Sequence, residues 1–145
     1  MSDPYGSPPP PGQGPYGQQP PPGGAPTSDD RTWAMAAHLG ALVTAWFAFG
    51  FLAPLLVMLA KDKDPFVRRH AVESLNFQIS LLIYSVVGTV LAVVIAVVTL
   101  GIGLLILVPV ILVILVLALF AIIQASMRAS NGEDYRYPLT LRFIS

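Results

Sequence analysis

The sequence predicts an all-α membrane protein, and three observations carry that prediction. Hydrophobic residues make up 54% of the 145-residue chain and charged residues only 11%, against roughly a quarter charged in an average soluble domain. No Asp, Glu, Lys or Arg occurs in residues 74–127 or in residues 32–60, and apolar runs longer than about 18 residues are typical of transmembrane helices. Residues 1–30 are instead rich in Pro and Gly. We therefore expect a disordered tail (1–30) followed by a multi-pass membrane domain (31–145) that forms a small helical bundle.

The Pro/Gly-rich tail is expected to have no packed structure. It holds ten of the 14 prolines and six of the 12 glycines, and such a composition buries too little apolar surface to offset its ordering entropy. It lacks the charged segment and apolar segment of a cleavable signal peptide. Two interpretations stay open: a solvated spacer, or a docking site for a proline-reading partner.

The longer charge-free run must contain two spans. As one helix its 54 residues would extend about 80 Å, more than twice the hydrocarbon core of about 30 Å. The glycines in residues 99–103 mark the break, so the sequence predicts two long antiparallel helices, about 65–99 and 103–129. They are expected to touch through small residues that repeat every four positions, namely Gly88, Ala92 and Ala96 in the first and Ala121 and Ala125 in the second.

The shorter run, 32–60, leaves two arrangements open. One long tilted helix would place Trp46 near the bilayer midplane, although Trp prefers the interface. A break at Phe49-Gly50 would give two short helices, about 32–47 and 50–62, each reaching only about 20 Å. The number of membrane helices, three or four, and the side on which the tail lies depend on this choice.

Basic residues indicate the orientation. They flank the long hairpin on both sides, whereas its tip, residues 100–102, carries no charge. The positive-inside tendency therefore predicts a plasma-membrane protein whose loop 61–73 and C-terminal segment are cytoplasmic.

Composition excludes several function classes. Eight basic and eight acidic residues cancel, so no nucleic-acid partner is expected. The absence of cysteine removes thiolate chemistry. The two histidines and the surface acids form no nucleophile–base pair or metal cluster in the sequence, and His38 has no second ligand at metal-binding spacing. We expect no catalytic, cofactor or metal site, no cofactor and no enzyme activity.

Polar side chains gather where the long hairpin begins. Asp64 followed by Pro65 predicts a helix start, and polar residues then occur on two sides of the helix. This pattern fits a helix wedged between neighbours, or one that borders a wet vestibule. His70 and Glu73, one turn apart, are expected to interact locally, while Asn76 and Gln78 are expected to bond to neighbouring helices.

The C-terminal segment, 133–145, alternates with a period of two, which is typical of an extended conformation. Because no second strand is predicted, we expect it to lie against the 61–73 helix and the lipid headgroups, either as an interfacial anchor or as a docking edge. Its arginines suit lipid phosphates. The expected interaction platform comprises Arg68, Arg69, His70, Glu73, Asn76, Gln78, Tyr135, Arg136, Tyr137 and Arg142.

Three runs carry a resemblance: "RTWAMAAHLGAL", "DPFVRRHAVESLNFQIS" and "ASNGEDYRYPLTLRFI". Over residues 31–144 the chain resembles a bacterial family of small membrane proteins without an assigned function, which is grouped with the chloroplast inner-envelope import component (Tic-twenty-like). The resemblance implies four membrane helices with both ends on one side. It implies no import role, because no substrate-handling residue matches.

Two functional hypotheses follow. The first is a non-enzymatic membrane protein that acts by assembly, as a homo-oligomer or with a membrane-protein partner. The alternative is a subunit of a channel or protein-translocation complex, as in the Tic-twenty-like relatives. Its water path would be lined by Asn76, Gln78, Ser80 and Ser85, although no charge lies in mid-membrane, where transporters usually place one.

Overall fold

The computed structural model describes residues 24–46 and 49–145. Within these residues it contains helices and no strands, which confirms the all-α prediction. Of the N-terminal tail expected to be disordered, residues 1–23 lie outside the described part. The four helices are α1 (Ser28–Ala45), α2 (Leu52–Ala60), α3 (Pro65–Val98) and α4 (Leu104–Ser130).

Helix α1 begins earlier than expected, because its start is capped. The Thr27 hydroxyl accepts a hydrogen bond from the Asp30 amide at 3.2 Å, and the Asp30 carboxylate accepts one from the Thr27 amide at 2.8 Å. This reciprocal capping box satisfies two backbone donors that a helix start leaves free. The membrane domain therefore includes Ser28–Asp30, which the sequence interpretation assigned to the tail.

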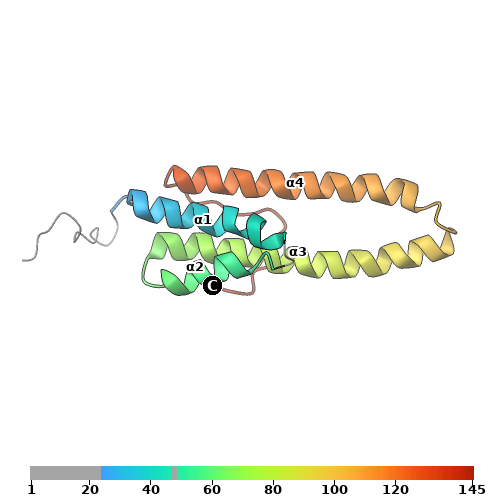
Figure 1. The fold of residues 1–145 in the computed structure, drawn as a ribbon, viewed down its shortest axis with the longest axis horizontal. Coiled ribbons are helices and arrows are strands. Elements are labelled where there is room, and N and C mark those ends of the chain that lie inside the picture. The colour runs from blue at the N-terminus through green and yellow to red at the C-terminus, as the bar shows by residue number, and fades with distance from the viewer. Residues whose placement is uncertain (1–23, 47–48) are drawn as a thin grey trace, which may run out of the picture.

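The first hydrophobic stretch forms two short helices rather than one span. Among the described residues only α3 and α4 are long and apolar enough to cross a membrane. Helices α1 and α2 fold back on each other beside α3 (Figure 1), and a Cβ built at Gly40 would lie only 2.8 Å from the Ala53 Cβ. Glycine thus permits a close approach that a larger side chain would prevent. Trp46 lies at the turn and is 89% exposed.

A salt bridge brings the outer ends of this short hairpin together. Lys61 Nζ, just after α2, lies 2.7 Å from Asp29 Oδ2 at the start of α1. The chain therefore enters and leaves the α1–α2 hairpin at the same end of the molecule. This excludes the arrangement in which residues 32–60 form a single span.

The molecule has two unequal halves (Figure 1). In the four-helix half, α1 packs with residues 65–81 of α3 and residues 118–130 of α4, and α2 packs with α1 and α3. In the two-helix half, residues 82–98 and 104–117 extend as an apolar hairpin whose large side chains are exposed. The buried core lies entirely in the four-helix half. Exposure of one continuous apolar surface is what a lipid solvent permits and water does not.

The small-residue stripes differ from the expectation that they join α3 to α4. Helix α1 lies between α3 and α4 in the four-helix half (Figure 1) and holds them apart. Gly88 is exposed, with no other atom within 4 Å of a Cβ built there, and Ala92 and Ala96 are only half-buried. Ala121 and Ala125 are buried, but in a cluster with the C-terminal segment and Phe77.

Candidate functional site

The C-terminal segment after α4, residues 131–145 (the C-terminal tail, hereafter the tail), is held by side chains of α3. Glu73 Oε1 accepts a hydrogen bond from the Tyr137 amide at 2.9 Å. Farther along α3, the Tyr84 hydroxyl donates to the Leu139 carbonyl at 2.8 Å. Between these two contacts the chain turns at Pro138-Leu139, where Leu139 has a φ of 57°.

After this turn the segment runs back along the same face of α3. Ser80 Oγ accepts from the Leu141 amide at 2.9 Å. Asn76 Oδ1 accepts from the amides of Phe143 and Ile144, both at 3.0 Å, and its Nδ2 donates to the Ile144 carbonyl at 2.9 Å. Side chains three or four residues apart on a helix thus replace the partner strand that the tail lacks, and they satisfy its backbone groups.

The alternation in the tail sequence does not correspond to one buried face. Tyr137 is only 3% exposed, whereas Leu139 is 87% and Phe143 58% exposed. The segment lies along α3 from Arg68 to Tyr84, so it contacts the expected 61–73 region and extends beyond it toward the hairpin tip. Tyr137 is therefore the one buried aromatic side chain of the described tail, and the exposed Leu139, Leu141 and Phe143 face outward.

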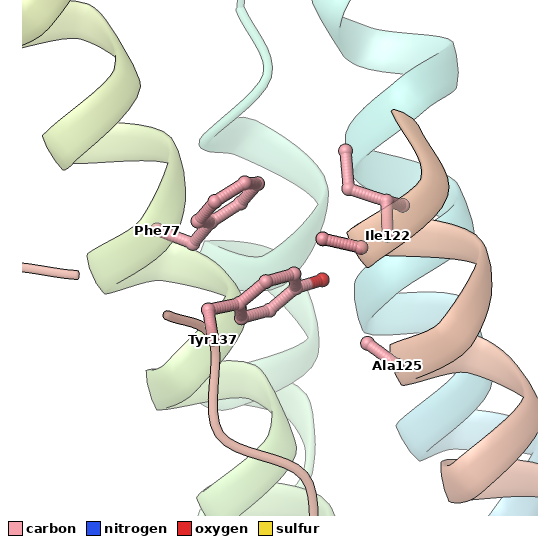
Figure 2. Close-up of a cluster of buried hydrophobic side chains, with 5 residues drawn as sticks. Phe77, Ile122, Ala125 and Tyr137 are labelled. Atoms are coloured by element: carbon pink, nitrogen blue, oxygen red, sulfur yellow. The ribbon is translucent and has the colours of Figure 1, made fainter. Parts of the chain in front are cut away.

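Tyr137 fills the space between α3 and α4 in the four-helix half. Its ring stacks on Phe77 with a centroid distance of 4.0 Å and an interplanar angle of 9°. Figure 2 shows the two rings beside Ile122 and Ala125 of α4, which complete the cluster. The small alanine in α4 leaves room for this ring, which accounts for the buried small residues in that helix.

The Tyr137 hydroxyl begins a buried polar chain. It lies 3.0 Å from Nδ1 of His38 in α1, and Nε2 of His38 lies 2.9 Å from Nδ1 of His70 in α3. Both histidines are fully buried. These three residues, the His–His–Tyr chain, link α1, α3 and the tail by hydrogen bonds. The expected His70–Glu73 contact is replaced, since His70 bonds to His38 and Glu73 bonds to the tail backbone.

Burial keeps this chain uncharged. It lowers the pKa of His38 to about 3, with a smaller contribution from the neighbouring His70. Burial likewise raises the pKa of Tyr137, assisted by Tyr135 and Glu73. Since the rings are neutral, each histidine has one donor and one acceptor nitrogen, and the tautomers along the chain are coupled.

A pocket of about 450 Å³ lies between the first turns of α3 and the tail. Two ion pairs lie on its wall: Arg69 Nε to Asp134 Oδ1 at 3.1 Å, and Arg142 Nη2 to Glu73 Oε1 at 3.6 Å. Eight of the ten expected platform residues line it, namely Arg68, Arg69, His70, Glu73, Asn76, Tyr135, Arg136 and Arg142.

The other two platform residues lie elsewhere. Tyr137 is buried in the core, as described above. Gln78 faces the α1–α2 turn, because a Cβ built at Gly50 would lie 2.6 Å from Gln78 Oε1. Eight of the ten expected residues therefore lie together at one pocket, while Tyr137 is in the core and Gln78 is at the α1–α2 turn.

The residues expected to line a water path have structural roles. Asn76 and Ser80 bond to the tail backbone. The Ser85 hydroxyl donates to the carbonyl of Leu82 in its own helix at 2.8 Å. These contacts, with Gln78 at the α1–α2 turn, explain the polar residues of α3 without a conduction path.

Sequence reasoning missed the His–His–Tyr chain. Its members are separated by 32 and 99 residues, so no local spacing relates them, and His38 was interpreted alone. Within the described residues no group of three or more His, Cys, Asp or Glu could hold a metal ion.

The chain matches one family model over residues 29–144, which covers all four helices and the tail. That family is described as the magnetosome magnetite crystal formation protein family, MamF/MmsF. No curated protein and no solved structure matches the chain. The expected relation to Tic-twenty-like proteins was wrong: its main support, a layout of four helices, is common to many small membrane proteins. With more than half of its length matched, the chain belongs to the MamF/MmsF family.

Proposed function

We propose that this protein is a non-enzymatic membrane component that acts by associating with copies of itself in the bilayer. Through this assembly it would contribute to the process that the family name gives, magnetite crystal formation. The observation that carries the proposal is the two-helix half, in which neither α1 nor α2 covers α3 and α4 (Figure 1).

The two-helix half offers a specific surface for association. Gly88 has no neighbouring atom within 4 Å of a built Cβ, and Ala92 and Ala96 follow at four-residue spacing on the same face of α3. Such small-residue stripes allow helix backbones to approach closely in lipid, where packing rather than the hydrophobic effect drives association. A second copy of α3 can therefore pack closely against this surface, which a bulky side chain at position 88 would prevent.

The proposed orientation keeps the charged half in the cytoplasm. Every charged residue of the described part falls within 29–31, 61–73 or 128–142, all in the four-helix half. From Ser74 to Val98, α3 is free of charge for 25 residues, about 37 Å, enough to cross a hydrocarbon core of about 30 Å. The positive-inside tendency then assigns the basic end to the cytoplasm.

This placement bears on how the protein would act. The opposite membrane face would receive only the hairpin tip, residues 99–103, which contains no Asp, Glu or His. Non-haem iron sites in proteins are commonly built from imidazole and carboxylate groups. The tip therefore offers no side-chain ligand for a crystal, and a contribution through membrane assembly is the better-supported role.

Substitution of the stripe tests the proposal. Gly88→Leu should place a large side chain in the contact and shift the protein in nanodiscs or mild detergent from oligomer to monomer by native mass spectrometry. Val90→Leu is the matched control, because Val90 is 60% exposed on the opposite side of α3 and the substitution should leave the oligomer intact. A monomer in the unsubstituted protein as well as in both variants, or equal effects of the two substitutions, would contradict self-association through this face.

The cellular role needs a separate test. In a magnetite-forming cell that carries this protein, Gly88→Leu at unchanged membrane abundance should alter crystal size or number in electron micrographs, and Val90→Leu should not. Normal crystals in a cell whose protein is shown to be monomeric would mean that self-association does not contribute to crystal formation.

A further inference from the structure

We propose that the pocket between α3 and the tail binds the phosphate group of one anionic phospholipid. The inference does not depend on self-association or on crystal formation, because it concerns only the four-helix half of a single copy.

Charge is the first argument. Four arginines line the pocket with two side-chain carboxylates, Glu73 and Asp134, and with Ser145, the last residue of the chain. The carboxylates are already engaged by Arg142 and Arg69, whereas Arg136 makes no ion pair within the described residues and Arg68 donates one bond, to the Ser145 carbonyl. An arginine carries five N–H donors, so most of the donor capacity of Arg68 and Arg136 is available for an oxyanion.

The second argument is a buried donor at the pocket wall. His70 is only 1% exposed, and its Nε2 has no hydrogen-bond partner. If the Tyr137 hydroxyl donates to His38 Nδ1, then His38 Nε2–H donates to His70 Nδ1, and the His70 proton resides on Nε2. The Asp134 carboxylate favours this tautomer, because its Oδ1 atom lies 3.9 Å from His70 Nε2 and attracts a proton on that nitrogen. His70 lines the pocket, and its buried N–H group lacks the acceptor that an oxyanion would supply.

The position of the pocket selects a lipid rather than free phosphate. His70 and Asn76 flank Ser74, where the charge-free part of α3 begins, which is the level of the headgroups in the proposed placement. Leu141 and Phe143 are exposed on the tail beside the pocket, and the turn of the tail reaches Tyr84 at the start of the two-helix half. A phosphate in the pocket would therefore leave room for acyl chains along the same face. Basic pockets at the cytoplasmic ends of membrane helices are known to hold anionic headgroups.

The test uses the full chain in phosphatidylcholine nanodiscs, with phosphatidylglycerol titrated in and bound lipid counted by native mass spectrometry. We expect one phosphatidylglycerol to be retained in preference to phosphatidylcholine. Arg136→Gln should weaken this retention about fivefold. Lys63→Gln is the matched control, since Lys63 is also exposed and free of ion pairs within the described residues but does not line the pocket, and it should have no effect.

Three results would overturn the inference. Equal retention of both lipids would show that the pocket does not select an anion. An equal effect of Lys63→Gln would indicate general surface charge rather than this pocket. Displacement of the lipid by inorganic phosphate at millimolar concentration would indicate a site for the free anion. Because Arg136 is an exposed tail residue, its substitution should leave the fold intact, which circular dichroism of the variant checks.

Discussion

His38 Nε2 and His70 Nδ1 lie 2.9 Å apart in the buried centre of the four-helix half. Their rings meet edge to face, with centroids 5.2 Å apart and an interplanar angle of 86°. This contact joins the short hairpin to α3, which is long and apolar enough to cross a membrane. It also positions both rings so that His38 can bond to Tyr137 of the tail. The packing of three separate parts of the chain thus depends on one pair of side chains.

The first prediction concerns this pair. His38→Leu should lower the free energy of unfolding by about 2–4 kcal/mol, because it leaves His70 Nδ1 and the Tyr137 hydroxyl buried without partners. His70→Leu should cost a similar amount. The double variant should lose about 1–2 kcal/mol less than the sum, since it removes both polar partners together. Denaturant unfolding in a mild detergent measures all three, and strictly additive losses would contradict a direct bond.

A second prediction concerns pH. The pKa of His38 is lowered in the folded protein from 6.5 to about 3 by burial, so between these values the unfolded chain binds a proton that the folded chain does not. Stability should therefore be constant above about pH 7 and fall as the pH decreases below 6.5, by up to about 1.4 kcal/mol per pH unit. Melting temperatures from pH 8 to pH 4.5 measure the slope. The slope should be smaller in His38→Leu, and an unchanged slope would assign the effect to other groups.

A third prediction separates the two contributions of Tyr137. Tyr137→Phe keeps the ring stacked on Phe77 and loses only the bond to His38, so it should cost about 1–2 kcal/mol. Tyr137→Ala should cost about 3–5 kcal/mol, because it also leaves a cavity beside α4. Tyr135→Phe is the control, since the Tyr135 hydroxyl bonds to Gln124 in a less buried position at 3.0 Å. If Tyr135→Phe and Tyr137→Phe were equally destabilising, the buried chain would have no special importance.

How far the sequence could predict this structure depends on the range of the interactions. The two long helices follow from charge-free runs, because a bilayer requires every spanning residue to avoid charge and to bond its own backbone. The capped starts at Thr27 and Asp64 are local as well, but only that at Asp64 was recognised. The sequence could not decide whether α1 and α2 form one helix or two. The interfacial preference of Trp46 argued against one long span, and the short length of each helix argued against two. The contact of Gly40 with Ala53 decides it, and that contact is tertiary.

The site shows the same division. Polar residues were expected on two sides of the helix, and the structure uses one of these sides, with Asn76 and Ser80, to hold the tail. The period of two in the tail indicated an extended segment, but it could not tell that one tyrosine is buried while its neighbours face outward. Nothing in the sequence relates His38 to residue 137, since a hydrogen bond between distant residues leaves no periodic signal.

The last prediction tests whether α3 side chains hold the end of the tail. Asn76→Leu removes the acceptor of the Phe143 and Ile144 amides and the donor to the Ile144 carbonyl, while Tyr137 still anchors the middle of the segment. The tail should then open locally after Leu141, which Ser80 still holds, without unfolding the helices. In hydrogen exchange monitored by mass spectrometry, the amides of Phe143 and Ile144 should exchange about 10- to 100-fold faster, as expected when a local opening costs roughly 1.4–2.8 kcal/mol less.

Ser85→Ala serves as the control, because the Ser85 hydroxyl bonds only within its own helix and its loss should leave tail exchange unchanged. Exchange in Asn76→Leu should remain slow in α1 and in the first turns of α3, which the His–His–Tyr chain holds together. Faster exchange throughout the four-helix half would mean that Asn76 supports the core as a whole. Unchanged exchange at Phe143 and Ile144 would mean that lipid contact of the exposed Leu141 and Phe143 side chains, rather than the α3 face, holds the tail in place.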